Sequence, residues 1–121
     1  MTGEPYARIA EESGYLRATF YLLSTEDGGR QTPITREYRP NWSIGSEPDG
    51  THMSGAPLVI DSAEGVAPGD CAEVLLFPMW PEFWEGVTPG TQLFAFEGLR
   101  VVGRAVVTAV VPPLGRPDST V

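Results

Sequence analysis

TEDGGRQTPITREYRPNW, residues 25–42, is the stretch around which the rest of the chain is organised. It opens with a charged turn that holds Gly28 and Gly29, and glycine accepts the positive φ that tight turns require. Two prolines follow. Because a proline cannot donate to a β-ladder, we expect this stretch to run along a sheet edge or to cross between strands. Three of the eight basic residues of the chain lie in it: Arg30, Arg36 and Arg39.

Strand patterns lie on both sides of this stretch. Over residues 15–22 side chains alternate with a period of two, which predicts a half-buried strand. Pro-Gly pairs at 68–69 and 89–90 predict type II turns, in which the glycine takes positive φ. We expect further short strands at residues 57–60, 71–77, 92–97 and 101–111.

These patterns predict an all-β fold with at most one turn of helix. About six short strands, separated by frequent turns, favour a six-stranded antiparallel closed β-barrel. Small residues on one face of the last strand, such as Gly103 and Ala105, suit the tight interior of such a barrel. We expect one β-barrel domain over residues 15–111, a loose leader over residues 1–14 and a flexible tail over residues 112–121.

The composition narrows the classes of function. The 121 residues carry sixteen acidic groups, eight arginines and no lysine, which gives a formal net charge of −8. Such a chain repels nucleic acid at long range, so we expect no DNA partner and at most a local, salt-sensitive contact with RNA. The apolar runs are too short to span a membrane. The single Cys71 cannot form an internal disulfide, which favours a cytoplasmic location.

Four segments carry a resemblance to a known family. RQTP at residues 30–33, YRPNW at 38–42, VAPGD at 66–70 and LFAF at 93–96 appear in this order. They resemble the GGRHTPF, YRPQF and VMPGD segments and the start of the RFAIREGGRTVGAGVV ending of the C-terminal β-barrel of elongation factor Tu. Several ordered motifs are more specific than any single one, and the resemblance covers about residues 16–111.

The resemblance implies a contact surface. In that family the barrel packs against the GTPase domain near the YRPQF segment and helps to hold the T-stem of aminoacyl-tRNA. Here Asn41 stands in place of the glutamine, and the REGGR loop is shortened to residues 97–100. No GxxxxGK[ST] loop is present, so we expect no nucleotide binding. The residues at matching positions are Arg30, Thr32, Tyr38, Arg39, Asn41, Glu97 and Arg100.

The three arginines of residues 25–42, Arg30, Arg36 and Arg39, have two interpretations. They could bind phosphate or an acidic partner. Alternatively, they could form ion pairs with acids of the same segment, which we favour because those acids lie so near in the sequence. The nearby acids are Glu26, Asp27 and Glu37.

A second candidate is MWPEFWE, residues 79–85, an added segment that makes its loop about five residues longer than in the family. If exposed, Trp80, Phe83 and Trp84 would be interface anchors, because tryptophan is enriched at binding hot spots. If folded inward, they would cap an open end of the barrel. The sequence leaves both alternatives open.

No catalytic, metal or cofactor site is predicted. His52 has no second His or Cys near it in the sequence, whereas a metal needs three or four ligands. Cys71 has no nearby histidine to activate it. We therefore expect a non-enzymatic binding module with a protein partner. The alternative is a role in translation, through weak contact of the Arg30–Arg39 segment with tRNA or with a GTPase domain.

Overall fold

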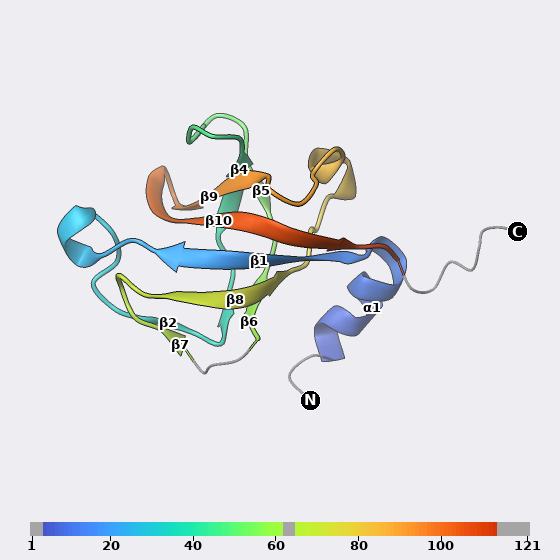
Figure 1. Ribbon diagram of the computed structural model, residues 1–121, viewed down its shortest axis with the longest axis horizontal. Helices are drawn as coiled ribbons and strands as arrows, with labels where there is room; N and C mark the ends of the chain where they lie inside the picture. The colour runs from blue at the N-terminus through green and yellow to red at the C-terminus, as the bar shows by residue number, and fades with distance from the viewer. Residues whose placement is uncertain (1–3, 62–64, 114–121) are drawn as a thin grey trace, which may run out of the picture.

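The computed structural model describes residues 4–61 and 65–113, so most of the predicted tail lies outside the described residues. It consists mainly of antiparallel strands (Figure 1). The longer strands lie where the sequence predicts them. In chain order the elements are α1 (Glu4–Ser13), β1 (Tyr15–Leu22), a 3₁₀ turn (Thr25–Asp27), β2 (Ile34–Thr35), β3 (Glu37–Tyr38), β4 (Asn41–Ile44), β5 (Ser54–Gly55), β6 (Leu58–Ile60), β7 (Gly65–Val66), β8 (Cys71–Leu76), a 3₁₀ turn (Pro81–Trp84), β9 (Gln92–Glu97) and β10 (Arg100–Val111).

Strand β1 lies in the middle of the sheet and supplies much of the core. It pairs antiparallel with β8 on one side and with β10 on the other. Its predicted alternation is confirmed, because every second side chain is buried and the others are at least partly exposed. The buried side chains are Leu16, Ala18, Phe20 and Leu22.

Eight strands form one curled sheet in the order β3-β6-β8-β1-β10-β9-β4-β5, and β2 pairs separately with β7 (Figure 1). The core lies inside the curl. There the rings of Phe20 and Trp42 meet edge to face at 5.9 Å, and the Trp42 indole N–H donates to the Ala56 carbonyl oxygen at 2.9 Å. The predicted all-β class and the barrel-like curl of the sheet are therefore confirmed.

The closed six-stranded barrel that we expected is not what the described residues form. Strands β3 and β5 lie at opposite ends of the described sheet and do not pair with each other. Strand β3 pairs with β6, whereas β4 pairs with β9. Between β3 and β4 lies Pro40, which has no N–H to continue a ladder. The fold is therefore a half-barrel, in which the chain at residues 39–40 links two parts of the sheet without ladder hydrogen bonds.

Irregularities in β10 help the sheet to curl. Its register with β9 shifts between Val101 and Gly103, and an extra residue in one strand bends that strand and increases its twist. Gly103 is required here, because a Cβ atom would lie 2.7 Å from the Phe20 ring and 2.8 Å from the Tyr21 carbonyl oxygen. The predicted small inward face is confirmed, since Gly103 and Ala105 are both buried.

Helix α1 corrects two expectations. We predicted a loose leader over residues 1–14 and at most one turn of helix, but Glu4–Ser13 form a helix of 10 residues. Gly14 follows the helix at φ 77°, a left-handed conformation that suits a glycine after a helix end. Ile9 packs against the small apolar cluster that contains Phe77. This contact explains the helix, because a helix so short is marginal without tertiary packing.

Candidate functional site

The turn that opens residues 25–42 is fixed by its own hydrogen bonds. Ser24 caps the 3₁₀ turn at Thr25–Asp27, and its hydroxyl accepts from the N–H of the last residue of that turn at 3.2 Å. Gly28 follows at φ 93°, and a Cβ atom on Gly29 would lie 2.4 Å from a neighbouring carbonyl oxygen. Both glycines are therefore required, and Arg30 leaves the turn from a fixed position.

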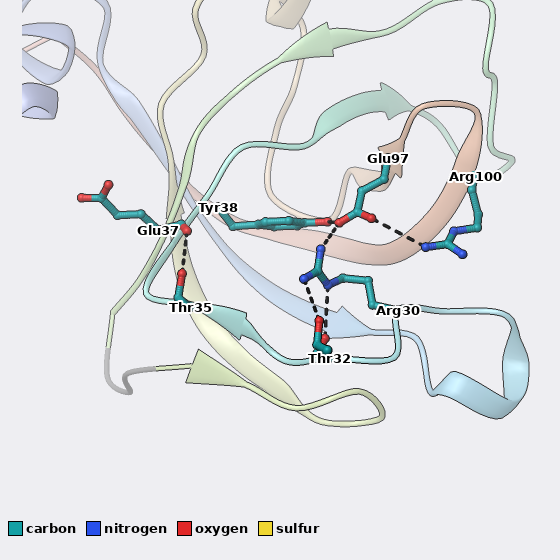
Figure 2. Close-up of polar contacts among 7 residues, drawn as sticks. All are labelled: Arg30, Thr32, Thr35, Glu37, Tyr38, Glu97 and Arg100. Carbon is teal, nitrogen blue, oxygen red and sulfur yellow. Dashed lines mark hydrogen bonds and ion pairs between the residues drawn. The ribbon is translucent and has the colours of Figure 1, made fainter.

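Five side chains gather beside this turn and form the polar cluster: Arg30, Thr32, Tyr38, Glu97 and Arg100 (Figure 2). One oxygen of Glu97 accepts hydrogen bonds from both the Arg30 guanidinium and the Tyr38 hydroxyl. Arg30 also donates to the Thr32 carbonyl oxygen at 3.2 Å and to the Thr32 hydroxyl at 3.0 Å. The other Glu97 oxygen lies 3.7 Å from Arg100. The cluster thus ties the Gly-Gly turn and β3 to the β9–β10 hairpin.

The polar cluster holds its members in their ordinary charge states. Burial raises the pKa of Glu97, but hydrogen bonds from Tyr38 and Arg30 and the charges of both arginines outweigh it, so that pKa lies below its ordinary value. Burial, and then the hydrogen bond and charge of Glu97, raise the pKa of Tyr38 well above its ordinary value. Burial lowers the pKa of Arg30, yet Glu97 reverses this and the pKa is raised. None of these three groups is tuned to exchange a proton near neutral pH.

An open pocket of about 520 Å³ lies beside the polar cluster, lined by Arg30, Arg100, Glu97 and the glycine turn. Two guanidinium groups line this pocket beside one carboxylate, and the acidic side chains of Glu26 and Asp27 lie in the adjoining 3₁₀ turn. The arrangement can attract an anionic group. It is not suited to proton-transfer chemistry, because the pKa values of Glu97 and Tyr38 move away from neutrality.

The structure brings together most of the residues at family-like positions. Arg39 and Asn41 are exposed and do not belong to the polar cluster. For Arg30 the predicted pairing with acids of its own segment is wrong, because its ion-pair partner is Glu97, 67 residues further along the chain. Asp27 instead accepts a hydrogen bond from the Ser24 hydroxyl at 3.0 Å.

The aromatic segment at residues 79–85 is divided between core and solvent. Trp84 is 6% exposed and Phe83 is half-buried, whereas Trp80 is 61% exposed and Met79 is 58% exposed. Each alternative that the sequence left open therefore describes one tryptophan: Trp84 packs inward and Trp80 faces solvent. The Trp84 indole N–H makes no hydrogen bond with any of the described residues.

A second pocket, of about 380 Å³, lies beside Trp80, and we call it the aromatic pocket. Trp80, Glu82 and Phe83 form one wall, and residues 51–53 form the other. The Trp80 indole N–H donates to the Glu82 carboxylate at 2.8 Å. The His52 ring lies 5.1 Å from the Phe83 ring at an interplanar angle of 34°. The sequence favours a solvated loop histidine over a metal ligand at residue 52, and no local pattern in it signals this second wall.

No protein-family model matches the chain. Within residues 4–61 and 65–113, no group of three His, Cys, Asp or Glu side chains is placed to hold a metal ion. Nor does any helix in those ranges have the length and apolar character that crossing a bilayer requires.

Proposed function

We propose that the chain is a non-enzymatic binding module that contacts another protein through an exposed patch formed by Met79 and Trp80. One observation carries this function: the two neighbouring side chains are 58% and 61% exposed. Tryptophan and methionine are enriched in protein interfaces, and tryptophan is prominent among the few residues that dominate binding energy. An exposed pair of this kind is therefore better explained by a partner than by the fold.

Contacts with the core and with β5 fix the segment that carries the Met79–Trp80 patch. Trp84 belongs to the main core cluster, and its ring meets the Phe83 ring at 5.7 Å. The Met79 N–H donates to the Gly55 carbonyl oxygen at 3.3 Å, which fixes the start of the turn. A surface that is ordered before binding loses less conformational entropy when a partner arrives. These contacts support the proposal that the patch is an ordered binding surface rather than part of a flexible loop.

We infer further that the half-barrel is related to the C-terminal barrel of elongation factor Tu and acts in the cytoplasm. The ordered motifs support this kinship. A single cysteine supports the location.

Copurification with matched variants tests the proposed interface. The tagged full chain is incubated with an extract of the cells that produce it, and bound proteins are identified by mass spectrometry. The variants are Met79→Ala/Trp80→Ala and, as a control, Leu99→Ala, because Leu99 is 81% exposed but lies outside the patch. We expect a partner that the control retains and that the double variant binds about tenfold more weakly or worse. If the double variant keeps every partner, the patch is not the interface.

A second candidate function is contact with tRNA or with a GTPase domain through the polar cluster. It is favoured by one observation, the presence of two guanidinium groups, those of Arg30 and Arg100, in the lining of one open pocket. Against it stands the engagement of Arg30 with Glu97, which leaves less of that guanidinium for a phosphate. Titration with aminoacyl-tRNA distinguishes the two candidates.

A further inference from the structure

The aromatic pocket has a chemical character that selects its occupant. Its walls present the rings of Trp80, Phe83 and His52 together with the carboxylate of Glu82. Aromatic faces carry a negative electrostatic potential and attract cations placed over them. No lysine or arginine is among the residues that line this pocket. The lining therefore offers attraction to a positive group and holds no lysine or arginine that would repel it.

Contacts within the pocket hold these groups in place. The hydrogen bond of 2.8 Å between the Trp80 indole N–H and Glu82 fixes the indole against the carboxylate. Contact between the His52 and Phe83 rings at 5.1 Å joins the two walls. Behind residue 51, the Asp49 carboxylate accepts from the Thr51 N–H at 3.0 Å and from its hydroxyl at 2.6 Å. Through these hydrogen bonds a second carboxylate lies next to Thr51, which lines the pocket.

The net charge of the whole chain also favours a cationic occupant of the aromatic pocket. With a net charge of −8, the protein attracts cationic partners at long range and repels a second copy of itself. Complementarity thus favours a basic segment of a different protein.

We propose that the aromatic pocket receives the cationic end of a lysine or arginine side chain from a basic segment of the protein partner. This inference rests on the proposed function, because it places the anchoring side chain of the partner next to the Met79–Trp80 patch. In the complex the aliphatic stem of that side chain lies against Trp80 and Phe83, and its charged end lies next to Glu82.

Nuclear magnetic resonance titration of the full chain tests the pocket directly. The probes are two capped peptides of glycine and serine that differ only at the central position, which is lysine in one and norleucine in the other. Norleucine keeps an aliphatic stem but carries no charge. We expect the lysine peptide to shift the Trp80 indole N–H resonance and to bind about fivefold more tightly than the norleucine peptide.

Two variants separate the effect of the Glu82 charge from that of the neighbouring apolar surface. Glu82→Gln keeps an acceptor for the Trp80 indole N–H but removes the charge, and we expect it to weaken the lysine peptide about fivefold while leaving the norleucine peptide unchanged. Met79→Ala is the matched control, because Met79 belongs to the same segment but does not line the pocket. It should leave the affinity for the lysine peptide unchanged.

The outcomes distinguish this inference from the function on which it rests. Equal affinity for the two peptides, or no shift of the Trp80 resonance, would overturn the cation pocket. Neither result would touch the Met79–Trp80 interface, which stands or falls on copurification with its double variant. Loss of lysine-peptide binding in Met79→Ala would likewise overturn the pocket, since binding would then depend on the patch instead.

Discussion

At the scale of single residues, Glu97 is the side chain on which the polar cluster depends. Its carboxylate accepts from Arg30 and Tyr38, and its folded pKa lies below the ordinary value of 4.5. A carboxyl group with a lowered folded pKa contributes stability that is fully present above its unfolded pKa and is lost as the pH falls through the folded one. Glu97 thus stabilises the native state at neutral pH, and this contribution fades in acid.

We expect Glu97→Gln to lower the free energy of unfolding at pH 7 by about 1–2 kcal/mol, since charge-assisted hydrogen bonds are lost. The difference from the natural chain should shrink as the pH falls below 4.5, where the unfolded carboxyl becomes protonated, and should vanish below the folded pKa. Urea denaturation across this range measures it, with Glu85→Gln as the control for the loss of an exposed carboxylate. An equal difference at pH 7 and pH 3 would show that the charge of Glu97 is not what matters.

At the scale of elements, the 3₁₀ turn at Pro81–Trp84 separates a buried tryptophan, Trp84, from an exposed one, Trp80. We expect Trp84→Ala to lower the free energy of unfolding by about 3 kcal/mol or more, because it opens a cavity in the core. Trp80→Ala should change it by less than about 0.5 kcal/mol, because the side chain is mainly solvent-exposed. Chemical denaturation of both variants measures the two values. Equal losses would contradict the division of this turn into an inner and an outer face.

The strands and the helix differ in how much their local sequence reveals. Strand β1 could be predicted because its alternation is complete within residues 15–22, and the Pro-Gly turns carry their own signal. Helix α1 is harder to predict: Tyr6, Ile9 and Ala10 have the i, i+3, i+4 spacing of a helical face, but the stretch between Pro5 and Gly14 is short and mainly polar. Proline is nevertheless tolerated in a first helical turn, where its missing N–H has no helical partner. The helix then forms by packing on the Phe77 cluster, which only the folded chain provides.

The candidate sites show the same limit more sharply. The sequence placed Arg30 and Glu97 in separate motifs, and their ion pair depends on folding that brings residues 67 positions apart together. Acids close in sequence were the expected ion-pair partners of Arg30, but the glycine turn directs its side chain to Glu97 instead. Only one wall of the aromatic pocket could be predicted from the sequence. Trp80 was a candidate binding residue, but the opposite wall of the pocket, at residues 51–53, belongs to another loop. Chain topology, rather than any motif, joins these two loops.

At the scale of the whole molecule, the net charge of −8 opposes the attraction of phosphate to the two arginines of the polar cluster. If two arginines contact phosphates, binding releases about two counterions, which gives a log–log salt slope near −2. The free energy from releasing two counterions is small compared with the electrostatic repulsion between RNA and a chain of net charge −8. We therefore expect aminoacyl-tRNA to bind with a Kd worse than about 100 μM at physiological salt, in the range of nonspecific binding.

Filter binding or a fluorescence titration with aminoacyl-tRNA at physiological salt measures this affinity. The informative variants are Arg39→Glu, within the best-matched motif, and Arg100→Glu, within the polar cluster. Arg17→Glu is the control, because Arg17 lies outside both and forms an ion pair with Asp61 at 3.3 Å. A Kd at or below about 1 μM that is lost in Arg39→Glu or Arg100→Glu but kept in Arg17→Glu would show that local charge outweighs the net charge. The translation-related role would then replace the protein interface as the better account of this half-barrel.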